Sequence, residues 1–491
     1  MIQTRLEKTN DIAHDLPAVI LTGRTGDFSR FGFSDRELSY IKTRIEKKEE
    51  LIVLHRLSTF VCLVINDSAR SFPGQLEFLR NISGKLHPLI NESEDNSLLV
   101  VDLEDNAELV IALAEGLILN NYRFDKYRKK TEGRDGFPGT IMVYSDSLKN
   151  DALDRLGILC DAVYMSRNLV NEPLSHLNAQ GLTEELSKMA VAAGFSLEVL
   201  DREKIESHQM GGLLAVNRGS IDPPTFSILE WKPDHFINEK PFVFIGKGIV
   251  YDTGGLSLKP TANSMDYMKS DMAGAAAVAG LFYALAKSGL PVHAIGLIPA
   301  TDNRPGGNAI VPGDIITMHD GTSVEVMNTD AEGRLILADA LSWSIRYDPG
   351  LVIDVATLTG SASAAVGTQG TVAMQKSADH WYKALEESGY YTHERLVLFP
   401  LWEEYREMLK SEIADIKNIG GKYAGAITAG KFLEHFVSFP WIHLDIAGPA
   451  YLHSEEGYRK KGGSAVGVRL LFDFIAKYSG KDKNYSVPAG S

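Results

Sequence analysis

The chain has 491 residues, of which 44% are hydrophobic and 23% are charged, a composition typical of a soluble globular protein with more than one domain. The formal net charge of -14 disfavours non-specific binding to a nucleic-acid backbone. Only two cysteines occur, Cys62 and Cys160, both in apolar stretches, so we predict two buried thiols and exclude a disulfide scaffold and a cysteine metal site.

The first third of the chain alternates between short apolar runs and helical stretches. We predict strands at residues 18–22, 59–65, 98–103 and 140–144, and a helix at residues 107–122. A basic stretch with interleaved aromatic residues follows at 122–130, and a loop is predicted at 131–138. We interpret the basic stretch as a solvated helix end whose aromatic side chains face the core, and a nucleic-acid contact through residues 126–130 stays the alternative.

A long helix is predicted at residues 151–170, and Pro173 prevents its continuation because the residue before a proline avoids helical geometry. We therefore predict an N-terminal domain at residues 1–147, a connecting helix at 148–170 and a catalytic domain at 171–491. The N-terminus has no secretory signal pattern, and no apolar run approaches the roughly 20 residues of a membrane span. The prediction is a cytoplasmic protein without a membrane partner.

The rest of the chain alternates between strands and helices, the pattern of an α/β domain with a largely parallel sheet. Strands are predicted at residues 242–245, 292–298 and 351–356, and helices at 273–287 and 331–346. The predicted fold is α/β with two domains: a smaller N-terminal α/β domain and a larger C-terminal α/β domain. The larger domain has a central, mostly parallel or mixed sheet flanked by helices.

Familiar catalytic motifs are absent from the sequence. Residues 425–432 begin like a phosphate-binding loop, but Phe432 stands where that loop needs Ser or Thr. No G-x-S-x-G nucleophile motif and no H-E-x-x-H zinc motif occur. Any enzymatic chemistry must therefore come from other residues.

Charged residues gather in glycine-rich segments where buried strands are predicted to end, and they are Lys247, Asp252, Asp271, Asp330 and Glu332. Ligands of open α/β sheets bind outside the carboxyl ends of the strands, so these side chains could converge at one rim. Four carboxylates in one site repel each other, and divalent metal ions are the natural compensation. Singly, each acid could instead be a helix cap or a surface ion pair, with Asp330 as an N-cap and Glu332 as a first-turn acid. The grouping favours a metal site.

Residues 328–335, N-T-D-A-E-G-R-L, resemble the signature of the leucine aminopeptidase (cytosol aminopeptidase) family. Residues 246–260 are similar to its first metal-binding segment, and the likeness extends to residues 167–173, 268–274 and 443–448. It covers most of residues 160–475, whereas the N-terminal third resembles the family only in general outline.

This resemblance implies an aminopeptidase that releases N-terminal, preferably leucine-like residues from peptides with a free α-amine. It implies two divalent metal ions per subunit, zinc or manganese first, with magnesium and cobalt also open. Asp252 and Glu332 would bridge both ions. Lys247 and Asp271 would complete the shell of one ion, and Asp330 that of the other.

The resemblance also implies roles for residues that do not bind metal. Lys259 would stabilise the oxyanion of the tetrahedral intermediate. Arg334 would hold a bicarbonate ion that shuttles the proton, with a surface ion pair as the alternative role. The pocket for the first side chain would be lined by Met268, Thr357, Gly360 and Ala447.

The family further implies a homohexamer in which the N-terminal domain serves assembly. Two other readings compete with the enzyme: a nucleic-acid-binding protein on the same scaffold, which the net charge of -14 disfavours, and a catalytically inactive relative. All five implied ligands, Lys259 and Arg334 are present, so the sequence gives no reason to prefer an inactive protein. The physiological metal and peptides stay open.

Overall fold

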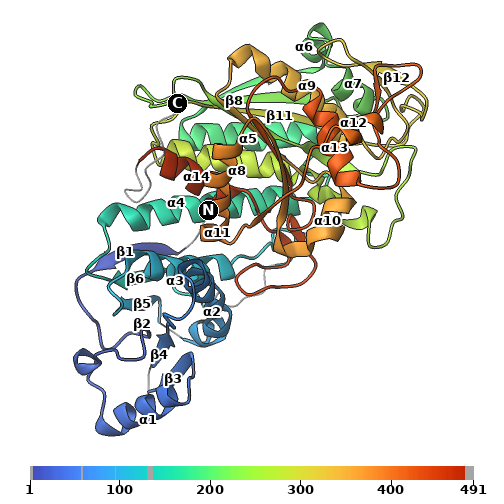
Figure 1. Cartoon of the computed structure of the whole chain (residues 1–491). Helices are drawn as coiled ribbons and strands as arrows, with labels where there is room; N and C mark the ends of the chain where they lie inside the picture. Colours follow the sequence, from blue (N-terminus) through green and yellow to red (C-terminus); the bar gives the residue numbers. More distant parts are fainter. Residues whose placement is uncertain (1–3, 57–58, 94, 130–136, 481–491) are drawn as a thin grey trace. The chain divides into compact units, whose positions relative to one another are not determined.

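The computed structural model describes residues 4–56, 59–93, 95–129 and 137–480 (Figure 1). It divides into two compact units, the first comprising Met1–Tyr164 with Ser454–Lys461 and the second comprising Met165–His453 with Gly462–Ser491. The division falls inside one long helix, α4 (Asn150–Asn171). A short return segment, Ser454–Lys461, thus belongs to the first unit although it lies far along the sequence.

The first unit is built on a six-stranded sheet of order β1-β6-β5-β2-β4-β3. All neighbours pair in parallel except β3 and β4. The strands are β1 (Arg5–Thr9), β2 (Ala18–Thr22), β3 (Leu51–His55), β4 (Phe60–Ile65), β5 (Ser97–Asp102) and β6 (Thr140–Tyr144), and the helices are α1 (Asp35–Glu46), α2 (Phe72–Glu92) and α3 (Ala107–Asn120), with a 3-10 turn η1 (Ser29–Phe31). Every residue of β2 and β4 is buried, which explains their uninterrupted apolar sequences.

The basic stretch at 122–129 differs from its prediction as a helix end. Helix α3 already ends at Asn120, and the following residues form turns and irregular backbone. Tyr122 is buried with its ring against Tyr164, but Tyr127 is 49% exposed. The expectation that all aromatic side chains of this stretch face the core is therefore wrong. Residue 130, and residues 131–136 of the predicted loop, lie outside the described residues.

The second unit contains a mixed sheet of nine strands with the order β16-β15-β18-β14-β9-β11-β8-β7, and β10 pairs with β11 beside this path. Its strands are β7 (Ser196–Leu200), β8 (Thr225–Trp231), β9 (Phe242–Gly246), β10 (Gly248–Asp252), β11 (Ala294–Asn303), β14 (Leu351–Ala356), β15 (Thr371–Lys376), β16 (Leu396–Leu398) and β18 (Trp441–Asp445). The central strands β11, β9, β14 and β18 run parallel, so their carboxyl ends lie at one edge. The predicted α/β class with a mixed sheet is confirmed.

The helices of this unit are α5 (Ala179–Ala193), α6 (Arg202–Ser207), α7 (Gly211–Asn217), α8 (Ala273–Lys287), α9 (Gly333–Ser344), α10 (Gly360–Val366), α11 (Asp379–Thr392), α12 (Glu404–Glu407), α13 (Gly425–Glu434) and α14 (Val468–Tyr478). Smaller elements are the 3-10 helices η2 (Met265–Met272), η3 (Ile345–Tyr347) and η4 (Gly367–Gln369), a three-stranded sheet of β12 (Ile315–Thr317), β13 (Ser323–Glu325) and β17 (Ile416–Lys417), and the pair β19 (Tyr451–Leu452) and β20 (Gly462–Gly463).

Helices α8 and α9 cover opposite faces of the large sheet (Figure 1). Val243 and Ile245 of β9 share a core cluster with Leu335 of α9, whereas Phe244 between them places its ring 6.4 Å from that of Phe282 of α8. Successive residues of a strand point to opposite faces, so the alternation separates the two helices. Both helices begin near the carboxyl edge of the central strands.

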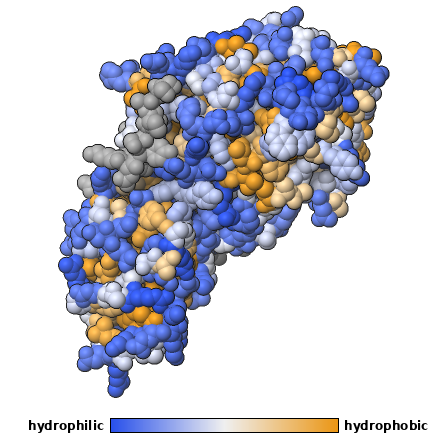
Figure 2. All heavy atoms as spheres, in the orientation of Figure 1, coloured by the Kyte–Doolittle hydropathy of each residue, from blue (hydrophilic) through white to orange (hydrophobic). Residues whose placement is uncertain are grey.

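The face of the molecule in Figure 2 is mostly hydrophilic, and the two cysteines are buried, as expected for a globular protein of this composition. Hydrophilic residues cover most of the face drawn in Figure 2, and hydrophobic residues form small separate groups on it. Cys62 and Cys160 are both buried and are not joined in a disulfide, as predicted. In the part of the chain that the structure describes, no helix is long and apolar enough to cross a membrane.

Candidate metal centre

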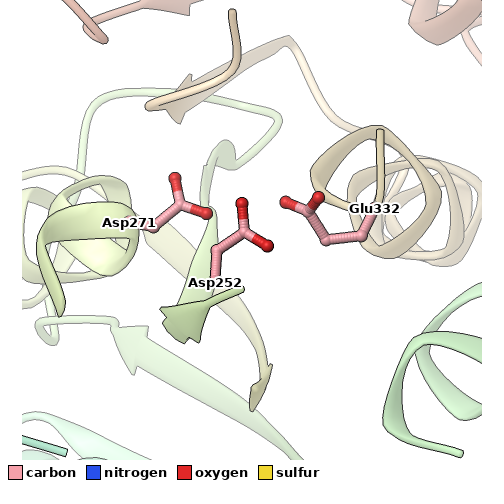
Figure 3. A group of neighbouring side chains, drawn as sticks. All are labelled: Asp252, Asp271 and Glu332. Atoms are coloured by element: carbon pink, nitrogen blue, oxygen red, sulfur yellow. The ribbon is translucent and has the colours of Figure 1, made fainter. Parts of the chain in front are cut away.

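The five predicted ligands come from four neighbouring segments at the carboxyl edge of the central strands. Lys247 lies between β9 and β10, Asp252 ends β10, Asp271 lies in η2, and Asp330 and Glu332 precede α9. Three of them, Asp252, Asp271 and Glu332, are buried and offer oxygen atoms that lie within 4.8 Å of one another. Figure 3 shows these three carboxylates turned toward a common centre.

Two lysines pair with these acids. Lys247 Nζ lies 2.8 Å from Asp271 and 3.0 Å from Glu332, and it donates a hydrogen bond of 2.9 Å to the carbonyl oxygen of Thr357. Lys259 Nζ lies 2.9 Å from Asp252 and also contacts Asp330. Four carboxylates against two ammonium groups leave an excess of two negative charges when all six groups are ionised.

The electrostatic crowding is visible in the pKa values of the acids. Burial, followed by the charges of Glu332 and Asp271, raises the pKa of Asp252 well above its usual range. Burial likewise raises the pKa of Asp271 to about 6. A cluster of buried oxygen donors with excess negative charge is the donor set that divalent cations prefer, so the residues fit a metal centre.

Neighbouring residues hold the acids in place. Asn303, the last residue of β11, donates from its side chain to Asp252 Oδ1 at 2.8 Å and to the Thr329 carbonyl at 3.0 Å. The Thr357 hydroxyl donates to Asp271 Oδ1 at 2.7 Å. Sequence reasoning did not find Asn303 because its predicted strand stopped at residue 298. The feature that could have identified Asn303 is its position at the carboxyl end of a strand parallel to β9, because ligands bind at that edge of an α/β sheet.

Two glycines permit the close approach of helices to this centre. A Cβ atom on Gly274, in the first turn of α8, would lie 1.9 Å from the carbonyl oxygen of Val355. A Cβ atom on Gly333, the first residue of α9, would lie 2.3 Å from the Lys247 Cε. Any larger residue at either position would push a helix or the lysine away from its place.

The capping alternative does not hold for Asp330. The N-cap of α9 is Glu332, and neither its side chain nor another one makes an N-cap hydrogen bond there. Asp330 instead lies beside Lys259, and its own backbone N–H donates to the Asn328 side chain at 2.8 Å.

Arg334 is buried, and it is not part of a surface ion pair. It donates from Nη1 to the carbonyl oxygen of Asn418 at 2.6 Å, and its Nε has no hydrogen-bond partner among the described residues. Burial lowers the pKa of Arg334 to about 10. A buried guanidinium with a donor to spare, close to the charge of Glu332, is suited to hold a planar anion.

The predicted pocket residues are distributed over three neighbouring segments. Met268 lies in η2, three residues before Asp271. Thr357 and Gly360 flank the end of β14 and the start of α10, and Thr357 touches both Lys247 and Asp271. Ala447 follows β18, the parallel neighbour of β14.

Comparisons with known proteins agree with this geometry. The model of the cytosol aminopeptidase family, catalytic domain, matches residues 164–472. A probable cytosol aminopeptidase of Chlorobium limicola (strain DSM 245 / NBRC 103803 / 6330) is 43% identical over 383 residues, which cover 75% of each chain. Another, of Geobacter sulfurreducens (strain ATCC 51573 / DSM 12127 / PCA), is 44% identical over 370 residues, or 74% of each chain.

Among solved structures, the chain is similar to the bottromycin maturation enzyme BotP in complex with Mn. The TM-score is 0.83 at 29% sequence identity, and the match covers 95% of this chain and 100% of that one.

Proposed function

The chain belongs to the cytosol aminopeptidase family and is a metal-dependent aminopeptidase, and we propose that it releases leucine-like residues from the N-termini of unblocked peptides. The observation that carries the proposal is the buried cluster of Asp252, Asp271 and Glu332 with Lys247 and Lys259 beside it. The two ammonium groups compensate only half of the charge of the four carboxylates, and buried like charges destabilise a protein unless further cations compensate them.

We propose that two divalent ions would be held by Lys247 and Asp271 at one ion, by Asp330 at the other, and by Asp252 and Glu332 at both. When bound, a pair of divalent ions supplies a polarised carbonyl and an activated water at neutral pH. Zinc or manganese is the expected metal, with magnesium and cobalt open. The manganese named with the similar BotP structure supports manganese.

Lys259 and Arg334 would perform the remaining chemistry. The side chain of Lys259 is 15% exposed, and its ammonium group contacts Asp252 and Asp330, where it can stabilise the oxyanion that develops on the scissile carbonyl. The spare Nε–H of Arg334 can donate a hydrogen bond to bicarbonate, which would accept and return the proton in the absence of a histidine base.

The free α-amine of the substrate would bind at the metal centre through its nitrogen lone pair, in the neutral form. An acetylated amine has no such lone pair, because acetylation delocalises it into the amide bond. The requirement for a free N-terminus therefore follows from the same cluster. Met268, Thr357, Gly360 and Ala447 would shape the pocket for the first side chain.

We further propose a cytoplasmic homohexamer in which residues 1–147 serve assembly, residues 148–170 connect and residues 171–491 carry catalysis. The support is the family membership and the division of the chain inside α4. Light scattering that gives the mass of a monomer would contradict the hexamer.

The experiment that tests the activity is hydrolysis of leucine p-nitroanilide and of its N-acetylated form, with added manganese or zinc and with a chelator. We expect turnover of the free-amine substrate alone, abolished by the chelator and by the double variant Asp330→Ala, Glu332→Ala. The matched control is Glu203→Ala, Glu206→Ala, which removes two exposed acids of α6 and should keep full activity. Absence of turnover with every metal would overturn the proposal.

A further inference from the structure

Asp445, the last residue of β18, is a buried carboxylate outside the metal cluster. It is 1% exposed. Its Oδ1 accepts from the backbone N–H groups of Leu358 at 3.1 Å, Thr359 at 3.4 Å and Ala447 at 3.2 Å. Its Oδ2 accepts from the Thr359 hydroxyl at 2.7 Å. One side chain thus receives four hydrogen bonds from two separate loops.

These two loops carry three of the four proposed pocket residues, Thr357, Gly360 and Ala447. The donors Leu358 and Thr359 lie between Thr357 and Gly360, and the third backbone donor is Ala447 itself. Thr359 also accepts from Ala362 N at 3.0 Å and so caps the start of α10. Asp445 therefore joins the loop after β14, the first turn of α10 and the loop after β18.

His443, two residues before Asp445 on β18, is a second buried group that interacts with Asp445. In the parallel register of β14 and β18, Asp354 lies opposite His443, and Ala356 lies opposite Asp445. His443 Nδ1 lies 2.6 Å from Asp354 Oδ1, and Trp441 donates to Asp354 Oδ2 at 2.7 Å. Burial disfavours the charged ring, but Asp354 and then Asp445 raise the pKa of His443 above its usual value, so positive charge is favoured next to the Asp445 carboxylate.

We propose that Asp445 is a positioning residue for substrate selection, which fixes the two loops that shape the pocket for the first side chain. This inference rests on the proposed function. A pocket distinguishes side chains that differ by one methylene by roughly 10–200-fold, and it does so only while its walls stay in place. Release of the loops lets them adapt to smaller side chains, so the preference falls although the metal centre keeps all its ligands.

The test compares leucine and alanine p-nitroanilides, for which kcat, KM and bound metal are measured in the metal-loaded protein. In Asp445→Asn, one acceptor oxygen becomes an amide donor, so the side chain can no longer accept from both the backbone N–H groups and the Thr359 hydroxyl. We expect the leucine-to-alanine ratio of kcat/KM to fall about 10-fold. KM for the leucine substrate should rise more than kcat falls, and the metal content should not change. Thr359→Val removes the hydroxyl that donates to Asp445 and accepts from Ala362 N, leaves the three backbone bonds to Asp445 in place, and should lower the ratio in the same direction by a smaller factor.

The matched control is Asp339→Asn on α9. Asp339 is also fully buried and accepts from two backbone N–H groups, those of Leu213 at 2.8 Å and His319 at 3.0 Å, but it joins no loop with a pocket residue. Asp339→Asn should therefore lower the stability and leave the substrate ratio unchanged.

The inference is overturned when Asp445→Asn lowers kcat equally for both substrates at a constant ratio. If Asp445→Asn does not fold, Thr359→Val becomes the test, and an unchanged leucine-to-alanine ratio of kcat/KM in that variant overturns the inference. A wild-type protein that hydrolyses neither substrate would overturn the proposed function itself, which keeps the two failures apart.

Discussion

Lys247 and Lys259 each contact two carboxylates, yet their surroundings differ in a way that fits different roles. The side chain of Lys247 is 3% exposed and is enclosed by Asp271, Glu332 and the Thr357 carbonyl. That of Lys259 is 15% exposed. A fixed, enclosed amine suits a metal ligand, whereas a more accessible ammonium suits contact with a substrate.

We predict that Lys259→Met retains bound metal, because the four acids and Lys247 remain, but lowers kcat about 100- to 1,000-fold, the usual loss of an oxyanion-stabilising donor. Metal analysis and steady-state kinetics on leucine p-nitroanilide measure both quantities. The control is Lys240→Met, which removes only an exposed ion pair with Asp348 and should keep wild-type kcat. Wild-type kcat in Lys259→Met would exclude Lys259 from the chemistry.

At the scale of elements, the centre depends on how closely two helices approach the ends of parallel strands. Helix α8 begins against β14 at Gly274, and α9 begins against Lys247 at Gly333. Strand β11 extends to Asn303, five residues beyond the predicted end at 298. Its polar last residues are buried beside β10, a pairing that the apolar pattern could not indicate.

We predict that Gly274→Ala destabilises the protein by about 1–3 kcal/mol, the usual cost of an overpacked core. The clash of the new Cβ with the Val355 carbonyl should also displace Asp271 and weaken metal binding about 10- to 100-fold, as changes around metal ligands do. Denaturant unfolding and metal titration give both values. Gly157→Ala in α4 is the control: its Cβ meets no atom within 4 Å, so stability should stay equal or rise by about 0.5–1 kcal/mol. An unchanged metal affinity in Gly274→Ala would contradict the account.

At the scale of the whole molecule, the chain forms two compact units, and the cluster of mutually repelling acids lies in only one of them. This distribution determines how metal binding changes the stability of the protein. A cation that binds the folded state and not the unfolded one stabilises the protein by mass action. The acids belong to the second unit, and none of them belongs to the first.

We predict that calorimetry with manganese or zinc at about 100 times its dissociation constant shows a stabilisation of about 2.7 kcal/mol per site. The transition of the second unit should shift to higher temperature, and a chelator should reverse the shift. The Asp330→Ala, Glu332→Ala protein should show no shift, whereas the Glu203→Ala, Glu206→Ala protein should behave as wild type. An equal shift in the variant without the two acids would place the bound metal elsewhere.

The sequence by itself determined the family, the α/β class and the positions of several strands, because each of these follows from residues that are adjacent in the chain. The octapeptide at 328–335 is one such pattern, and its family assignment is confirmed. The predicted strands at residues 18–22, 140–144 and 351–356 occur with the same bounds. The strands at 18–22 and 351–356 are buried throughout and the strand at 140–144 buries alternate residues, so apolar runs of this kind mark strands that face a core.

Only the tertiary structure decided which distant residues support the centre. Asn303 reaches Asp252 across 51 positions of the chain, and Asp445 reaches Leu358 across 87. The tertiary structure also decided that Arg334 is buried rather than paired on the surface and that Asp330 does not cap α9. Parallel strand pairing brings such residues together, and the register of that pairing depends on the whole sheet, so no local pattern in the sequence records it.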